Sequence, residues 1–164
     1  MVMGTSKEPV LSDDGTEHLW YYTGCTVTHG VELSQKRMSI GLARWRLHRF
    51  LSLDAAAVVG DEVEAVVETV VLSVPGGRLE VNADILEDGY MQIEVFGEEQ
   101  EEGPPVGFPR GASVPLSGDS LHHTVRWDGA GEVDLLPPGL VRLRIRWQRA
   151  RLFAFCVVPA TGRL

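Results

Sequence analysis

The chain has 164 residues, of which 44% are hydrophobic, which is enough for one domain with a packed core and a short extension. Its formal net charge is −8 and its pI is about 5.1. This balance argues against nucleic acid as a main partner, because binding to phosphates requires a basic face. Two cysteines are too few for a small secreted domain that relies on disulfides. We expect Cys25 and Cys156 to be buried thiols, and a disulfide between them stays open as the alternative.

The first residues carry no recognisable targeting signal. Residues 1–12 contain one cation, Lys7, and no apolar run of signal-peptide length. No segment approaches the ~20 apolar residues that a membrane-spanning helix needs, so we expect no membrane partner. If the chain is complete, we expect it in the cytoplasm; if it is the end of a longer protein, a signal further upstream would allow secretion.

Two aromatic-rich stretches predict strands in the N-terminal third. Residues 1–16 are polar and contain Asp13-Asp14-Gly15, which is typical of a flexible tail that ends in a turn. Residues 18–23 (HLWYYT) and 38–46 (MSIGLARWR) read as two antiparallel strands. A two-stranded ribbon is marginally stable in water, so we expect this pair to pack on something else.

The middle of the chain predicts a β-hairpin. Residues 61–74 favour a strand from about Val66 because β-branched side chains dominate there. Residues 78–85 and 90–96 both alternate between apolar and polar side chains. Glu87-Asp88-Gly89 lies between them and is typical of a tight hairpin turn.

The C-terminal third predicts three more strands, over residues 121–128, 140–149 and 152–158. The last is almost continuously apolar, as in a strand near the centre of a sheet. Gly- and Pro-rich loops separate the strands, and no helical periodicity is sustained. The sequence therefore predicts an all-β fold, an antiparallel β-sandwich of the jelly-roll kind.

Two charged features have a solvent-exposed interpretation. The acidic run Glu98–Glu102 is typical of a solvated loop, with a cation site as the less favoured alternative. The second feature is a row of arginines at alternate positions of residues 140–149, for which cross-strand ion pairs are the favoured explanation and an anion-binding surface the other. The acidic partners expected for this row are Glu80, Asp84 and Glu94.

Gly118-Asp119-Ser120-Leu121 spells the block that names the GDSL esterases, in which the serine is the nucleophile. Such a serine needs a base and an orienting acid within hydrogen-bond reach. The Asp-x-x-His pattern that would supply them runs from Asp119 to His122 and overlaps the serine itself. We therefore predict no catalytic residue and keep a small serine hydrolase using Ser120 as the least favoured function.

A metal site is not predicted. His122 and His123 are adjacent, and neighbouring side chains on a strand point to opposite faces. No spaced set of His, Cys and Asp supports a transition metal. A structural Ca²⁺ held by carboxylates such as Asp119 has no support in a pattern, so we expect no cofactor.

Aromatic side chains provide the candidate binding residues. Tyr22, Trp45 and Trp127 are candidates for stacking on sugar rings, and core packing is the competing interpretation. The acidic residues of the chain do not form the paired arrangement around a scissile bond that glycoside hydrolysis requires.

Several motifs taken together resemble the C-terminal end of glycoside-hydrolase-like proteins with a five-bladed β-propeller, of the family 32/43 kind. Their order and spacing over residues 18–155 carry the resemblance more than any one motif does. The stretches are LWYYTG (19–24), the Thr28-His29-Gly30 loop, SIGLARWRLHRFLSLDA (39–55), GGRLEVNAD (76–84), the loop around Gly107-Phe108, PLSGDSLHHTVRW (115–127), LVRLR (140–144) and ARLFAF (150–155).

The resemblance implies a boundary at about Asp54. Residues 17–54 would be the closing strands and linker of a propeller's last blade, and residues 55–164 an appended β-sandwich. The catalytic carboxylates of that family belong to the propeller, so none is carried onto this chain. The implied function is a non-catalytic accessory sandwich that stabilises or positions a propeller. A free-standing carbohydrate-binding module is the alternative, and self-association through the N-terminal hairpin is the alternative to a propeller partner.

Overall fold

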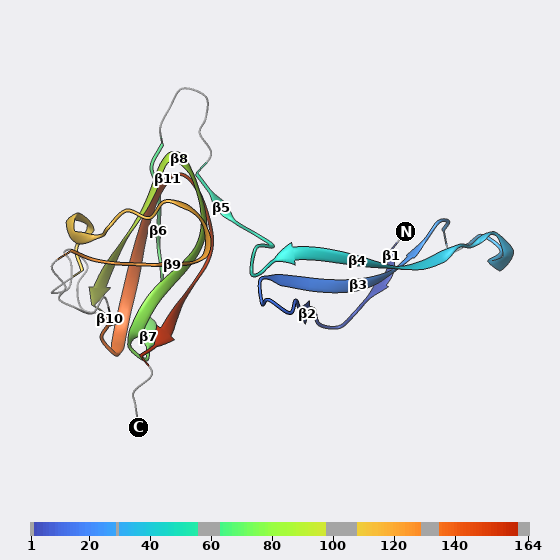
Figure 1. The fold of residues 1–164 in the computed structure, drawn as a ribbon, viewed down its shortest axis with the longest axis horizontal. Helices are drawn as coiled ribbons and strands as arrows, with labels where there is room; N and C mark the ends of the chain where they lie inside the picture. The colour runs from blue at the N-terminus through green and yellow to red at the C-terminus, as the bar shows by residue number, and fades with distance from the viewer. Residues whose placement is uncertain (1, 29, 56–62, 98–107, 129–134, 161–164) are drawn as a thin grey trace. The chain divides into compact units, whose positions relative to one another are not determined.

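The computed structural model describes residues 2–28, 30–55, 63–97, 108–128 and 135–160. It is all-β and antiparallel, consistent with a β-sandwich (Figure 1). The chain forms two compact units, Met1–Phe50 and Leu51–Leu164. The division falls four residues before the boundary expected at Asp54.

The N-terminal unit is a single antiparallel sheet with β3 at its centre (Figure 1). β4 pairs with β3 along its whole length, which confirms the predicted antiparallel pair. β1 and β2 pair one after the other with the opposite edge of β3, so the prediction of a flexible tail over residues 1–16 is wrong. The strands are β1 (Val2–Thr5), β2 (Val10–Leu11), β3 (Glu17–Cys25) and β4 (Met38–Arg46), with a 3-10 turn η1 (Leu33–Gln35) before β4.

A hydrogen-bonded turn joins β2 to β3 and explains why the polar N-terminal residues are ordered. The Ser12 hydroxyl donates to Asp14 Oδ1 at 2.6 Å, and the Thr16 backbone N–H donates to the same oxygen at 3.0 Å. Gly15 takes a left-handed φ of 70°, which costs glycine little. These hydrogen bonds lower the pKa of Asp14 to about 2, and the bond from Ser12 makes the largest contribution.

The second unit is built on two long strands, β8 and β11, that pair with each other over their whole length (Figure 1). β5, β6 and β7 pair with the other edge of β11, and β9 and β10 pair with the other edge of β8. The strand expected over residues 152–158 is the second half of β11, and beyond Leu152 it pairs with β8 alone, so the expected central position is wrong for most of it. The strands are β5 (Leu53–Asp54), β6 (Ala65–Glu68), β7 (Leu72–Val74), β8 (Gly77–Gly97), β9 (Gly118–Thr124), β10 (Leu135–Leu136) and β11 (Gly139–Pro159), with a 3-10 turn η2 (Arg110–Ala112) before β9.

The hairpin predicted at Glu87-Asp88-Gly89 is wrong, because these residues lie inside β8. Tyr90 pairs with Gln148 and Ile85 pairs with Ala150, so that the single residue Arg149 lies opposite residues 86–89. The turn-forming residues make a wide bulge instead of a reversal of the chain. Both flanking halves of β8 then have the same continuous partner, β11.

The bulge bends both long strands at the same level. Asp88 has a φ of 62° and Arg149 a φ of 50°, which are left-handed conformations that increase the local bend. A Cβ on Gly89 would lie 2.7 Å from the carbonyl oxygen of Arg149, so this position requires glycine. The left-handed residues at the bend are Asp88 and Arg149, and Gly89 is not one of the glycines with a positive φ.

The bend folds the sheet over a single core. Inward-facing side chains of both halves of β8 and of β11 belong to one buried cluster. Trp127 and Leu116, from the segments on either side of β9, complete it. The largest fully buried side chains of the cluster are Leu79, Val81, Met91, Ile93, Val95, Val125, Leu136, Leu143 and Ile145.

The arginine row of β11 is paired with carboxylates on its own face of the sheet. Arg146 Nε donates to Glu94 Oε1 at 3.0 Å, and Arg146 Nη1 donates to Glu64 Oε2 at 3.1 Å. Arg144 pairs with Glu68 and lies 3.7 Å from Glu94. The predicted partner Glu94 is thus confirmed, and the segment containing β6 supplies two partners that the prediction missed.

The other two predicted partners lie elsewhere. The Glu80 carboxylate pairs with Arg78 of its own strand, and Asp84 lies opposite Arg151 in the far half of β11. The ion-pair explanation of the row therefore holds with a different set of acids. The acidic run Glu98–Glu102 lies outside the described residues.

Candidate functional site

One face of the N-terminal sheet gathers the aromatic side chains of β3 and β4. The register places His18 opposite Trp45, Trp20 opposite Ala43 and Tyr22 opposite Gly41. Directly opposite residues of an antiparallel pair share a face, and so do alternate residues along each strand. These aromatic residues of β3 therefore lie on one face with Gly41, Ala43 and Trp45 of β4, and the small residues leave room for the rings.

The Phe50 ring contacts both tryptophans of this face. Its ring centroid lies 5.1 Å from that of Trp20 and 5.6 Å from that of Trp45, and it stacks on His18 at 5.3 Å. Trp20 and Trp45 meet edge to face, with centroids 5.8 Å apart and planes at 84°. Tilted and edge-to-face contacts at these separations are favourable for aromatic rings, so the two indoles are held at a fixed angle.

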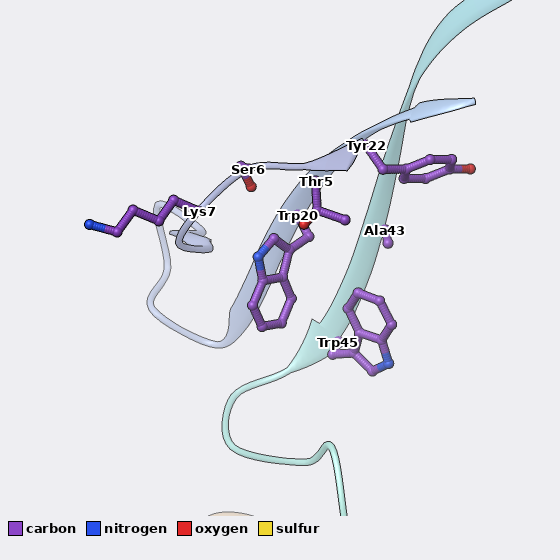
Figure 2. Close-up of a pocket in the computed structure, with 7 residues that line it drawn as sticks. All are labelled: Thr5, Ser6, Lys7, Trp20, Tyr22, Ala43 and Trp45. Carbon is purple, nitrogen blue, oxygen red and sulfur yellow. The ribbon is translucent and has the colours of Figure 1, made fainter. Parts of the chain in front are cut away.

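An open pocket of about 520 Å³ lies against this face. Figure 2 shows the rings of Trp20 and Trp45 close together, with Lys7 and Tyr22 on opposite sides of them. One of the lining side chains is a cation, and none of these described residues is a carboxylate. The lining residues are Thr5, Ser6, Lys7, Trp20, Tyr22, Ala43 and Trp45.

The hydroxyl of Ser6 is the unusual polar group in the pocket wall. The Ser6 backbone N–H donates to the Tyr21 carbonyl at 2.9 Å, which holds this residue beside β3. The Ser6 Oγ atom is buried and has no hydrogen-bond partner within the described part of the chain. A buried hydroxyl without a partner costs about 1–3 kcal/mol, so this group gains from any ligand or water that reaches it.

Gly41 makes room for the Tyr22 ring. A Cβ at Gly41 would lie 2.3 Å from Tyr22 Cζ, so the ring lies flat against the bare backbone of β4. A glycine opposite an aromatic residue on the neighbouring strand is a recognised cross-strand arrangement. This pairing is a signal in the sequence that could have located the pocket.

The structure brings two of the three predicted sugar-stacking residues together. Tyr22 and Trp45 both line the pocket, and Trp45 is 41% exposed. Trp127 is 2% exposed, its indole N–H donates to the Ile93 carbonyl at 2.8 Å, and its ring meets Phe108 edge to face. Trp127 is therefore part of the core of the second unit, and its prediction as a sugar-binding residue is wrong.

Sequence reasoning missed the other half of the pocket. Trp20 alternates in phase with Tyr22 and could have been included on that ground. Thr5, Ser6 and Lys7 could not, because residues 1–16 were interpreted as a tail, and only the pairing of β1 with β3 places them against the aromatic rings.

The opposite face of the same sheet is apolar and exposed, and we call it the bare face. Its members come from β2, β3 and β4, and Ile40 is the most exposed of them, at 78%. Large exposed apolar patches mark contact surfaces more often than isolated exposed residues do. The bare face consists of Val10, Tyr21, Met38, Ile40 and Leu42.

The GDSL letters lie in a strand rather than a catalytic elbow. Gly118 begins β9, and Ser120 Oγ accepts a hydrogen bond from the His122 backbone N–H at 3.0 Å. The His122 ring Nδ1 lies 3.0 Å from Glu80 Oε2. Burial acts to raise the pKa of Glu80, but hydrogen bonds from Arg78 and His122 outweigh it and the pKa is lowered.

The cysteines and histidines do not gather around a common point. Cys25 is buried and Cys156 exposed, both are free thiols, and the expectation that Cys156 is buried is wrong. The pKa of the Cys156 thiol is raised, first by the partial burial of the sulfur and second by the nearby Glu80 carboxylate. Among the described residues, no three His, Cys, Asp or Glu side chains are placed to hold a metal ion.

No helix among the described residues is long and apolar enough to span a membrane. Comparisons with family models, curated proteins and solved structures found no match for this chain. The function is therefore argued from the pocket and the bare face.

Proposed function

We propose that the chain is a non-catalytic accessory β-sandwich of a glycoside-hydrolase-like protein, whose N-terminal sheet packs against blades of a β-propeller. The observation that carries this proposal is the bare face. A blade of a propeller is a four-stranded sheet that packs against neighbouring blades. The N-terminal sheet also has four strands, with β1 and β2 sharing one edge of β3, and its bare face exposes large apolar side chains that a neighbouring blade would cover.

The two units differ in how complete their cores are, which indicates where a partner is needed. The second unit encloses a cluster with side chains at 0% exposure, such as Leu79 and Ile145. The N-terminal unit is one layer thick, and large side chains such as Ile40 and Leu42 are largely in water. Complete burial of such a side chain contributes about 1.5–3 kcal/mol. Covering the bare face would thus stabilise the unit by several kcal/mol.

The alternatives have weaker support in the sandwich itself. A carbohydrate-binding module built on the sandwich should present a row of exposed rings, whereas Trp127 and Trp147 are 2% and 3% exposed. For a serine hydrolase, Ser120 should face an imidazole, whereas the hydrogen bond to its Oγ comes from a backbone N–H, and the His122 ring is directed at Glu80. Both observations favour the accessory function.

The proposal is tested by covering or disrupting the bare face. The coding sequence upstream of residue 1 should continue as an open frame for propeller blades, and a stop codon there would contradict the proposal. The chain expressed alone should self-associate in sedimentation velocity, because the bare face lacks its partner. Leu42→Asp should return it to a monomer.

A matched control separates the bare face from general surface hydrophobicity. Leu86 is 52% exposed at the bend of the second unit, against 44% for Leu42. Leu86→Asp should leave self-association unchanged. A chain that is monomeric at all concentrations, or equal effects of the two substitutions, would count against docking through the bare face.

A further inference from the structure

We infer that the aromatic pocket of the N-terminal sheet binds a sugar ring that carries a carboxylate, of the uronic acid class. The pocket uses the face of the sheet opposite the bare face, since Tyr22 and Tyr21 are successive residues of β3. The inference goes beyond docking to a propeller and does not depend on it.

The rings supply the apolar contacts of the site. Trp20 and Trp45 stand at 84° to each other and form two walls of a corner, and Phe50 holds both of them from the side. A pyranose ring presents C–H groups on its faces and hydroxyls at its rim, so it can lie on one indole and abut the second. Because the rings are already fixed, little side-chain entropy is lost on binding.

The charge of the site favours an anion. Lys7 is the charged residue of the lining, and an ammonium pairs well with a carboxylate. Residues 1–50 carry six Lys and Arg against five Asp and Glu, whereas residues 51–164 carry nine against eighteen. The acidic character of the chain is thus confined to the second unit, and the pocket lies in the slightly basic one.

The hydroxyls of the wall favour a polyhydroxylated ligand over a plain aromatic acid. Thr5 and Ser6 line the pocket next to Lys7, along the segment that leads from Lys7 toward Tyr22 in Figure 2. The Ser6 Oγ atom is buried and has no partner among the described residues, so a sugar hydroxyl would satisfy it only if the side chain turned toward the bound ring. The volume of about 520 Å³ is within the range of small-molecule sites and accommodates one or two sugar rings.

The experiment is calorimetric titration of the full chain with trigalacturonate and with its carboxyl-reduced, neutral counterpart. Trigalacturonate should bind more tightly than the neutral trimer and should quench tryptophan fluorescence, because two of the four tryptophans lie at the site. Benzoate, a flat acid without hydroxyls, should bind more weakly than trigalacturonate.

Two matched pairs of variants locate the site. Lys7→Gln should weaken the binding of trigalacturonate about tenfold, which is the effect of losing one charge-assisted hydrogen bond. The same substitution should leave the affinity for the neutral trimer unchanged. Lys36→Gln, at the other lysine of the chain, should change neither. Tyr22→Ala should weaken the binding of both trimers, whereas Tyr21→Ala, on the bare face, should weaken the binding of neither.

The outcomes separate this inference from the proposed function. Binding that survives Leu42→Asp while self-association is lost supports the two faces as separate sites. The inference is overturned by absence of heat with either trimer, by equal affinity for both, by benzoate binding most tightly, or by equal effects of Tyr21→Ala and Tyr22→Ala. Far-UV circular dichroism of each variant identifies loss of the sheet as distinct from loss of the site.

Discussion

The two units use the same residue types in opposite ways. In the second unit the tryptophans are interior, with Trp127 and Trp147 at 2% and 3% exposure, and the charged residues are paired across the outer face. In the N-terminal unit Trp20 and Trp45 form the wall of an open pocket, and aliphatic side chains face solvent on the reverse. The second unit thus encloses its large rings in a core, whereas the N-terminal unit leaves its rings and aliphatic side chains at the surface.

Substitution of the tryptophans should show this difference most strongly. Trp127→Ala removes a buried ring and its hydrogen bond to Ile93, and should lower the free energy of unfolding of the second unit by about 3–5 kcal/mol. Trp45→Ala should leave that transition unchanged, since its ring belongs to the other unit. Urea titrations followed by circular dichroism measure both, and equal losses would remove the distinction between the units.

The ion pairs of the outer face should come next in size. Glu94 is 8% exposed, and its carboxylate accepts a hydrogen bond from Arg146. The guanidinium of Arg144 also lies 3.7 Å from this carboxylate. Glu94→Ala leaves these arginines without a close acid from β8 and should cost about 2–3 kcal/mol. The control is Glu68→Ala, whose side chain is 50% exposed, and it should cost less than about 1 kcal/mol. Thermal unfolding at neutral pH compares them.

The bend provides a smaller, backbone-based test. Gly89→Ala places a Cβ 2.7 Å from a carbonyl oxygen of the facing strand and should destabilise the second unit by about 1–3 kcal/mol. Gly111→Ala should be close to neutral, because nothing lies within 4 Å of its added Cβ. If the two variants have the same melting temperature, the bulge is more tolerant than its geometry indicates.

Acid should affect the second unit through Glu64. The Tyr90 hydroxyl donates to Glu64 at 2.7 Å and, as the largest cause, lowers the pKa of that carboxyl from 4.5. The ionised form is thus favoured on folding, so this contribution is present above pH 4.5 and is lost as the pH falls through the lowered value. Tyr90→Phe should cost about 1 kcal/mol at pH 7 and less at pH 3; an equal cost at both would contradict this linkage.

Local patterns in the sequence predict the strands of this protein well and their connections less well. The alternation in residues 78–85, 90–96 and 140–149 is present in the structure as inward and outward faces. The failure at Glu87-Asp88-Gly89 has a physical reason, because the same positive φ serves a reversal or a bulge, and the choice depends on the distant strand β11. The register of a far partner is not encoded in the local residues.

The candidate site shows the same limit. Tyr22 and Trp45 could be selected as surface rings, but Trp127 could not be distinguished from them by residue type. What separates them is whether a second layer covers the strand, which is a tertiary property. Lys7 could be found only once β1 was known to lie beside β3.

The pairing of β8 with β11 also has a consequence for how the chain folds. Gly97 pairs with Val141 at one end and Gly77 with Pro159 at the other, so even the nearest partners are far apart in sequence. Such non-local contacts require large loops to close first, which slows folding. The N-terminal sheet is joined by short connections and should form early. During synthesis, the edge of β8 that pairs with β11 would therefore stay open until the last strand has left the ribosome, and this interval is when the chain is most exposed to aggregation.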